Sequence, residues 1–144
     1  MKQLVEKLKV VLATAYSLSL KAQNYHWNVV GENFDEYHDF FGVYYEEVSK
    51  YVDMYAEHIR QLNSYAPGSL SRFSELTKIS DETGIPSARF MFVRLDSDNS
   101  LFLELLKELR NLAEEAEDFG LVNTVEDAIR FHSKMKWMIK ARLD

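Results

Sequence analysis

Apolar residues recur at steps of three and four along most of this 144-residue chain. That spacing places side chains on one face of an α-helix. The first such stripe predicts a long helix over residues 3–28, which should end near Val30 and Gly31 because glycine is common just beyond a helix end. Its members are Leu4, Leu8, Val11, Leu12, Ala15, Leu18 and Ala22.

A second apolar stripe predicts a helix over residues 35–63, which Asn33 or Asp35 can cap. Its members are Phe41, Tyr45, Val48, Val52, Tyr55, Ile59 and Leu62. Only a few residues join the two helices, so the helices should be antiparallel neighbours. His26, near the end of the first helix, should then fall close to His38, near the start of the second.

Two breaks follow the second helix. The first is the sequence Tyr-Ala-Pro-Gly-Ser at residues 65–69, after which Ser69 or Ser71 can cap a short helix that continues to about Thr77. A glycine and a proline within residues 81–86 mark the second break.

A third long helix is expected from about Ser87 to Phe119, with Gly120 ending it. Its polar run at residues 96–100 has the composition of a turn followed by a new helix start, so the sequence alone leaves a break there open.

Asn123 or Thr124 should cap a final helix that runs to about Leu143. Four long helices, with a short extra helix in the crossover between the second and third, predict an all-α fold in which residues 1–144 form a single four-helix bundle domain. The inward candidates of the final helix are Val125, Ile129, His132, Met135 and Ile139.

Composition narrows the classes of function. Hydrophobic residues make up 47% and charged residues 28% of the chain, as in ordinary globular proteins rather than disordered ones. No apolar run approaches the roughly 18 residues of a membrane span, and no signal peptide is evident, so we expect a cytoplasmic protein with no membrane partner.

The absence of cysteine leaves oxygen and imidazole nitrogen as metal ligands, which favours iron, manganese or zinc over copper(I). The net charge of −6 argues against a general nucleic-acid binder.

Four potential metal ligands lie within residues 24–57: His26, His38, Asp53 and Glu57. At about 100° per residue, the last three share one side of the second helix, yet the rise of about 1.5 Å per residue separates His38 from Asp53 by roughly 22 Å. No single ion can touch both ends. A shared metal would require the two histidines of one subunit to meet the two carboxylates of another, and an antiparallel dimer about a two-fold axis would make that site twice.

Each of these residues also has an ordinary structural interpretation. A single histidine at a helix end is more often a capping or partly buried group than a ligand, and an Asp-x-x-x-Glu pair is usually solvated. The surrounding aromatic residues favour the metal interpretation, because desolvated imidazoles and carboxylates need a partner. The chain also lacks any Glu-x-x-His pair, with which di-iron bundles build a site inside one subunit.

These motifs resemble those of the Dps family of miniferritins (DNA-binding proteins from starved cells) over essentially the whole chain. The resemblance rests on Asn-Tyr-His-Trp-Asn at residues 24–28, on Gly31, Phe34 and His38, on Asp53-x-x-Ala-Glu57, on residues 65–69, and on Phe-His-x-Lys-x-x-Trp-Met at residues 131–138. It implies a ferritin-like fold and a hollow homo-oligomer of about twelve subunits built from two-fold dimers. It also implies that Fe(II) is oxidised, preferentially by hydrogen peroxide, and stored as ferric mineral. His26 and His38 would come from one subunit, and Asp53 and Glu57 from its partner.

Three departures from the family pattern bear on the site. Position 42, where the family commonly has an iron-binding aspartate, is Gly42, so the site could hold a di-iron or a mono-iron centre. The family usually has arginine where this chain has His58, which is either a lost ion pair or a third imidazole near the site. No lysine-rich or arginine-rich tail of the kind that grips DNA is evident, which argues against strong DNA binding.

Further residues are assigned secondary roles by the resemblance. Trp27 would lie close to the iron and intercept oxidising equivalents, or else serve as a packing aromatic, whereas Trp137 is expected in the core. Near the start of the last helix, the positions of a three-fold iron channel are Asp118, Asn123 and Asp127, with Glu126 nearby. Glu46 and Glu47 are candidates for mineral nucleation. Ordinary helix capping and a solvated helix face explain these acids equally well.

The leading hypothesis is therefore a ferroxidase that stores iron and protects the cell from oxidative stress, with peroxide or dioxygen as oxidant. The alternative is a nucleoid-compacting DNA-binding protein with little ferroxidase activity. A third possibility is a shell that binds zinc, which could substitute for iron, without redox chemistry.

Overall fold

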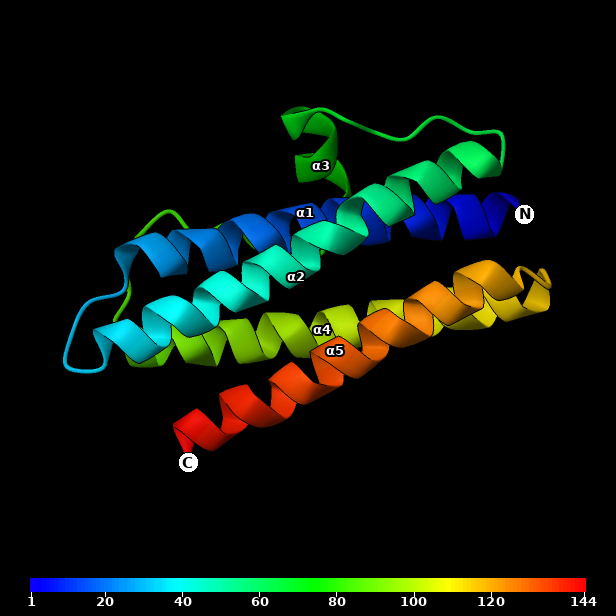
Figure 1. Cartoon of the computed structure of the whole chain (residues 1–144). Helices are drawn as coiled ribbons and strands as arrows, with labels where there is room; N and C mark the ends of the chain where they lie inside the picture. The colour runs from blue at the N-terminus through cyan, green and yellow to red at the C-terminus, as the bar shows by residue number, and fades with distance from the viewer.

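A computed structural model describes all residues, 1–144, and contains five helices and no strand. They are α1 (Lys2–Asn28), α2 (Phe34–Gln61), α3 (Leu70–Leu76), α4 (Ala88–Glu115) and α5 (Phe119–Leu143). The four long helices form a bundle in which α1 packs against α2 and α4, and α4 against α5, while α3 lies outside against α1 (Figure 1). The predicted all-α four-helix bundle with a short helix in its long crossover is confirmed.

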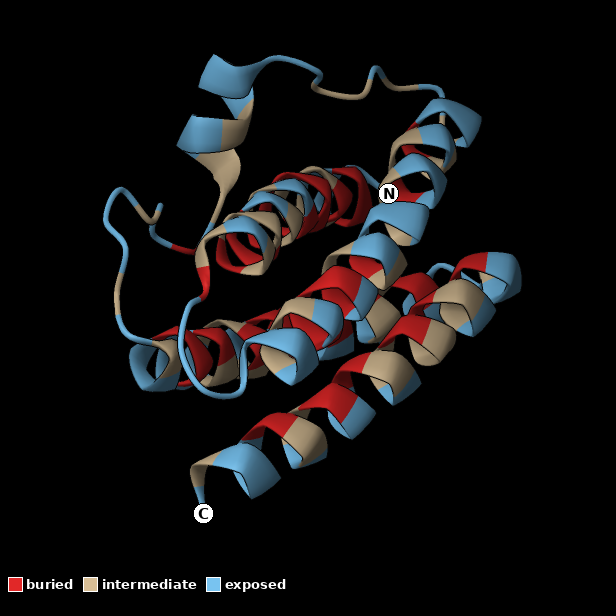
Figure 2. Ribbon diagram, turned by 60° about the vertical axis from the view of Figure 1, so that its left-hand side comes forward, coloured by how far each residue is buried: buried red, intermediate tan, exposed pale blue.

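The apolar stripes of the four long helices converge on a single core. Figure 2 shows the buried positions on the inward side of each long helix and the exposed positions on the outward side. Leu8, Leu18 and Ile59 are among the fully buried members of this cluster. The periodicity of the sequence therefore identified the faces that pack together.

Most predicted helix ends agree with the structure to within a few residues. α1 ends at Asn28, and Gly31 takes a positive φ of 122° in the loop that follows, a conformation that favours glycine. Ser69 caps α3 and Ser87 caps α4, since each side chain accepts a hydrogen bond from the backbone N–H three residues ahead. Asn33 precedes α2 but makes no side-chain capping bond.

The prediction for the corner between α4 and α5 was wrong. α4 already ends at Glu115, and the chain turns through Glu117, which has a positive φ of 56°. Asp118 then caps α5 by accepting a hydrogen bond from the backbone N–H of Leu121. Gly120 consequently lies in the first turn of α5 instead of ending α4, and the predicted caps at residues 123 and 124 lie inside the helix.

The polar run at residues 96–100 does not interrupt α4. The side chains of its last three residues, 98–100, find partners on other helices. Asp98 pairs with Lys21 of α1 at 2.7 Å, and Ser100 accepts a hydrogen bond from Lys136 of α5 at 2.6 Å. Burial raises the pKa of Asp98, and the Lys21 ammonium acts in the opposite direction.

The crossover between α3 and α4 is fastened to α1. Lys21 also donates a hydrogen bond to the backbone carbonyl of Ser80, and the Tyr25 hydroxyl donates one to Glu82 at 2.8 Å. Arg94 donates to the same carboxylate. These bonds hold the crossover against the end of α1 that carries His26.

The prediction that Trp137 lies in the core was wrong. Its side chain lies on the surface of α5, where 67% of it is exposed. No helix is long and apolar enough to span a membrane.

Candidate metal centre

His26 and His38 meet where α1 ends and α2 begins. The Nδ1 atom of His26 lies 2.6 Å from the backbone oxygen of His38, and the Nδ1 atom of His38 lies 2.6 Å from the backbone oxygen of His26. Their rings stack with centroids 3.8 Å apart and planes 14° apart. The sequence predicted this proximity from the short loop between the helices.

The reciprocal bonds fix the tautomer of both imidazoles. A carbonyl oxygen can only accept a hydrogen bond, so each Nδ1 must carry a proton. In a neutral ring, Nε2 is then left with a free lone pair, the form in which histidine binds metals. His26 lies in the last turn of α1, where its carbonyl has no helical partner to compete with His38. The pair therefore leaves Nε2, and not Nδ1, as the metal-binding position of each ring.

Aromatic side chains hold the two rings in place. The Phe34 ring stacks on His38 with centroids 5.1 Å apart, and Tyr45 lies against His26 with centroids 5.5 Å apart. Both histidines are half-buried. Gly42, which follows His38 by four residues on α2, is buried beside the His26 ring.

The carboxylates of Asp53 and Glu57 lie farther along α2 and are exposed to solvent. Within one chain, no three side chains of the histidine, aspartate and glutamate types come together as a metal site. A single subunit thus offers two imidazoles at one place and two carboxylates at another.

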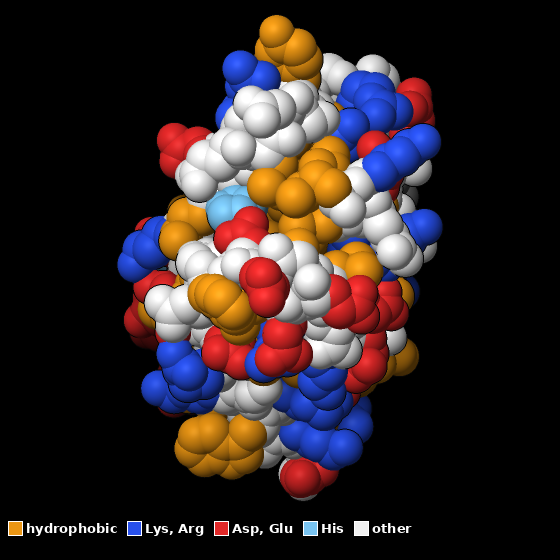
Figure 3. Space-filling view, turned by 90° about the vertical axis from the view of Figure 1, so that its right-hand side faces the viewer, with side chains coloured by type: hydrophobic (Ala, Val, Ile, Leu, Met, Phe, Trp, Pro, Cys, Tyr) orange, Lys and Arg blue, Asp and Glu red, His pale blue; other side chains and the backbone are white.

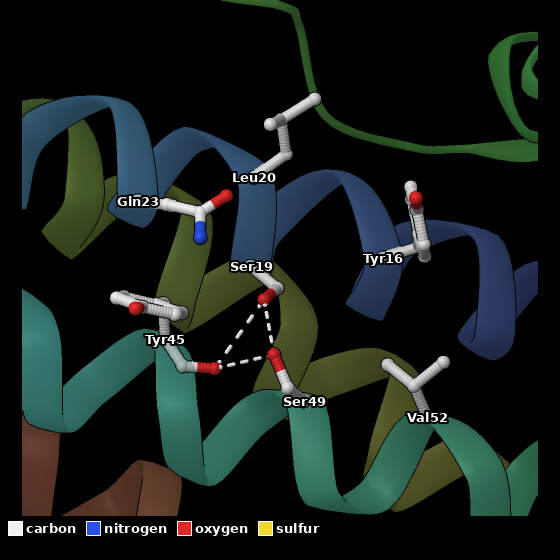
Figure 4. A pocket seen from close by; sticks show the side chains of 7 residues that line it. All are labelled: Tyr16, Ser19, Leu20, Gln23, Tyr45, Ser49 and Val52. Carbon is white, nitrogen blue, oxygen red and sulfur yellow. Dashed lines mark hydrogen bonds between the residues drawn. The ribbon is translucent and has the colours of Figure 1, made fainter.

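A groove between α1 and α2 begins beside the histidine pair. It has a volume of about 210 Å³, and Figure 4 shows Tyr45, which contacts His26, lining it together with Ser19 and Ser49. The two serine hydroxyls lie 2.7 Å apart. Tyr16 and Leu20 flank the groove as partly exposed apolar side chains.

Comparison with known proteins places the chain in a family. Residues 5–144 match the family described as the ferritin-like domain. A protein from Helicobacter pylori named "DNA protection during starvation protein" is 32% identical over 139 residues, covering 96% of each chain. The chain belongs to the ferritin-like family, within its Dps branch.

Solved structures agree with that assignment. A Dps protein from Bacillus brevis superposes with a TM-score of 0.95 at 29% identity, covering 99% of this chain and 96% of that one. A Dps protein from Vibrio cholerae, described as a member of a broad superfamily of ferritin-like diiron-carboxylate proteins, superposes with a TM-score of 0.94 at 28% identity. It covers 99% of this chain and 90% of that one.

The tryptophan of the Dps motif at residues 24–28 lies on the surface. Trp27 is 62% exposed, although it directly follows the half-buried His26. It is therefore not a core-packing aromatic within a single chain, and its predicted place near iron stays a prediction.

The three acids predicted for an iron channel already have partners in the same chain. Asp118 lies 2.6 Å from Nε2 of His58, Glu126 pairs with Arg110 at 3.1 Å, and Asp127 pairs with Arg130. Figure 3 views the bundle from the end that carries the α4–α5 corner, where acidic side chains gather between basic ones. The channel role of these acids stays a prediction, as does that of the exposed Asn123.

The nucleation candidates on α2 also differ from one another. Glu46 is exposed, whereas Glu47 pairs with Lys50 at 2.6 Å. Their role in mineral formation stays a prediction.

His58 bonds to Asp118, at the corner between α4 and α5, in the same subunit. This contact joins the end of α2 to the start of α5, so the geometry favours a structural role for His58 over a third imidazole at the metal site. His132 is likewise no ligand candidate, because it is buried in the core and its Nδ1 is hydrogen-bonded to Asn99.

Sequence reasoning missed one contributor to the site. Gly42 was noted only for the carboxylate that it lacks, while in the structure it is the neighbour against which His26 packs. The available signal was a glycine inside a predicted helix, four residues after His38.

Proposed function

We propose that this protein is an iron-oxidising and iron-storing miniferritin that protects the cell from oxidative stress. The observation that carries the proposal is the histidine pair, in which each Nδ1 is held by the other residue's backbone oxygen, so that Nε2 of each ring is the nitrogen left for a metal ion. The diiron-carboxylate description of the Vibrio cholerae relative supports iron as the substrate.

The site is completed between two subunits. Asp53 and Glu57 are exposed and lie away from the histidines of their own chain, so a partner subunit must supply the carboxylates. Carboxylate oxygens bind Fe(II) and favour Fe(III) still more, which assists oxidation, and imidazoles complete the ligand set. Such two-fold dimers would build a closed shell of about twelve subunits.

The ring geometry supports two iron positions in each site. An imidazole binds a metal along the lone pair of its nitrogen, which lies in the ring plane, at about 2.1 Å. Two stacked rings only 14° from parallel cannot both hold one ion in this way, because their planes do not meet near the nitrogens. Each histidine would therefore bind its own ion, although Gly42 supplies no additional carboxylate.

Two adjacent Fe(II) ions match the electron demand of hydrogen peroxide. Each ion gives up one electron, the O–O bond breaks, and two protons from solvent complete two water molecules. Hydrogen peroxide is the preferred oxidant in this proposal, with dioxygen the slower one. The ferric product then moves into the shell and is stored as mineral.

The test combines oxidant stoichiometry with substitution of the carboxylates. Anaerobic Fe(II) should be consumed at two ions for each peroxide, and the particles should gain electron-dense cores. The double variant Asp53→Ala with Glu57→Ala should slow the first phase of oxidation by about 100-fold or more. Glu104→Ala, which removes an exposed acid of α4 to which no iron role is assigned, serves as the control. Early oxidation as fast as in the parent would show that the site is misassigned.

A second candidate function is suggested by the name of the Helicobacter pylori relative. A DNA-binding protein would retard duplex DNA at low salt and lose affinity steeply as salt rises. The net charge of −6 opposes this function. Retardation at low salt without any peroxide-driven iron oxidation would favour it, whereas Zn²⁺ uptake without redox turnover would indicate a zinc-binding shell.

A further inference from the structure

We infer that a second copy of this chain packs along one exposed stripe of α2, and that an acid and a base of this stripe form ion pairs across the two-fold axis. The acid is Glu46, and the base is the partner's Lys50. The inference rests on the proposed function and deepens it, because it names the surface and the register through which the partner completes the iron site. The members of this α2 stripe are Glu46, Lys50, Asp53 and Glu57.

The α2 stripe follows from the two-turn spacing of its members. Glu46 precedes Asp53 by seven residues, and Lys50 precedes Glu57 by seven. Seven residues at about 100° each return the helix to within roughly 20° of the same side. All four side chains are exposed. The surface that presents the two carboxylate ligands therefore continues toward the middle of α2 as one base and one acid.

A two-fold axis determines where along α2 the two subunits cross. The shared site requires His38 of one subunit to be level with Asp53 and Glu57 of the partner subunit. In an antiparallel pair of identical helices, the axis passes midway between residues that face each other, so it crosses α2 at about residue 46. Lys50 lies one turn farther on. Glu46 is then only about 4–5 Å along the helix from the partner's Lys50.

Both charged side chains are available for a contact across the axis. Glu46 has no ion pair within its own chain, and Lys50, which pairs with Glu47 at 2.6 Å, keeps 69% of its side chain exposed. An ammonium group has three N–H donors, so Lys50 can bind carboxylates of both chains. Parallel helices would instead set each charge opposite its own copy. The charge pattern therefore selects the antiparallel register.

The groove beside the α2 stripe supplies apolar surface to the same contact. Figure 4 shows its wall on α2, formed by Tyr45, Ser49 and Val52 at the level of the axis. Tyr16 and Leu20 on the α1 side are 40% and 43% exposed. The Ser49 hydroxyl already donates to the backbone oxygen of Tyr45 at 2.7 Å. Covering the groove therefore leaves this hydroxyl paired, and it buries apolar surface, which is favourable.

The first test uses the absence of cysteine from the chain. In the assembled, metal-free protein, Glu46→Cys should form a disulfide between subunits under mild oxidation, because residue 46 meets its own copy at the axis. A non-reducing gel should show most chains as covalent dimers. Glu104→Cys, at an exposed position of α4, is the matched control and should remain monomeric on the same gel. Intact assemblies of Glu46→Cys without covalent dimers would overturn the inference.

The second test separates contacts between chains from contacts within one chain. Glu46→Lys makes the pair of positions wholly basic, and Lys50→Glu makes it wholly acidic. Each variant alone loses two ion pairs and gains two like-charge contacts, so the dissociation constant of its dimer should rise about tenfold at low ionic strength. The two variants, one of them isotope-labelled, are then dissociated, mixed and reassembled.

In the mixed dimer, both contacts across the axis are attractive, whereas the contacts within each chain stay repulsive. Native mass spectrometry should therefore find mixed dimers well above the half that random pairing gives. The exposed pair of Glu104 and Lys107 on α4 supplies the control. Glu104→Lys and Lys107→Glu change the net charge equally, and their mixture should pair at random. Random pairing of the α2 variants, or an equal excess for the α4 variants, would contradict the inference.

The outcomes separate this inference from the proposed function. If Glu46→Cys forms covalent dimers but Asp53→Ala with Glu57→Ala oxidises Fe(II) as fast as the parent, the dimer surface stands and the iron site is wrong. If no covalent dimer forms while those two substitutions still abolish the fast phase, the iron site stands and the partner approaches by another surface.

Discussion

Asn99 and His132 share two hydrogen bonds in the centre of the bundle, where neither is exposed to solvent. The Nδ1–H of His132 donates to Oδ1 of Asn99 at 2.7 Å, and the Asn99 amide donates to the backbone oxygen of His132 at 2.9 Å. The Tyr44 hydroxyl donates to the same Oδ1 at 2.7 Å. This network connects α2, α4 and α5 within an otherwise apolar core.

Asn99→Ala should destabilise the protein by about 2–4 kcal/mol. The substitution leaves two buried donors, of Tyr44 and His132, without an acceptor and also opens a small cavity. Denaturant unfolding at a fixed protein concentration measures the loss. An effect below about 0.5 kcal/mol, the range of ordinary surface substitutions, would mean that the network contributes little.

Two buried tyrosines of α2 should respond differently to loss of the hydroxyl. Tyr44→Phe removes a hydrogen bond and should cost about 1 kcal/mol. The Tyr55 hydroxyl is buried without any partner, so Tyr55→Phe should be neutral or stabilising. Unfolding measurements on both variants check the difference, and an equal cost would contradict it.

His132 should make stability depend on pH in acid. Burial lowers its pKa from 6.5 to about 3, so the unfolded chain binds a proton that the folded chain rejects. The stabilising contribution of the neutral ring is complete above about pH 6.5 and is lost as the pH falls toward 3. The free energy of unfolding should fall by at most about 1.4 kcal/mol per pH unit from this residue.

The measurement is the pH dependence of unfolding for the parent and for His132→Gln, which cannot titrate. Subtracting the two curves cancels the contribution of other groups. A difference between the curves that stays constant between pH 4 and pH 7 would contradict the assignment.

Asp118 should matter for stability through two contacts, because it caps α5 and bonds to His58. Asp118→Ala should cost about 1–2 kcal/mol. Asp118→Asn should recover most of the capping contribution, since asparagine caps helices as well as aspartate does. Unfolding of the two variants checks this order, and an asparagine variant as unstable as the alanine one would assign the effect to the contact of the carboxylate with His58.

The sequence was sufficient for features that depend on spacing along one chain. Repeated apolar positions identified the buried faces of α1, α2 and α5, and the short loop after α1 predicted that His26 meets His38. Where two local signals competed, the prediction failed. Glycine at position 120 predicts a helix end, but Asp118 two residues earlier caps the first turn of α5, and that turn accommodates the glycine.

Features that depend on packing between helices were not predictable in the same way. Trp137 stands two residues from both Met135 and Ile139, off the inward stripe of α5, so its expected burial rested on its residue type and not on its spacing. The structure leaves 67% of it exposed. The tight contact of Gly42 with His26 depends on ring positions that no spacing rule specifies. The meeting of His26 with the carboxylate pair depends on a second chain, so it stays a prediction.

Mixing two inactive variants should restore activity if the site is shared between subunits. One variant carries His26→Ala and His38→Ala, and the other carries Asp53→Ala and Glu57→Ala. In a mixed dimer, one site receives histidines from one chain and carboxylates from the other, while the second site receives neither. With random pairing, half of the dimers are mixed, so about a quarter of the sites should be intact.

The measurement is the fast phase of Fe(II) oxidation by peroxide after the two variants are dissociated, mixed and reassembled. Each variant reassembled alone is the control and should lack the fast phase. Recovery to about a quarter of the parent amplitude requires ligands from two chains at one site, because neither variant chain holds a complete set. If the mixture stays as inactive as its components while the parent survives the same treatment, His26 and His38 do not share a site with a partner's Asp53 and Glu57.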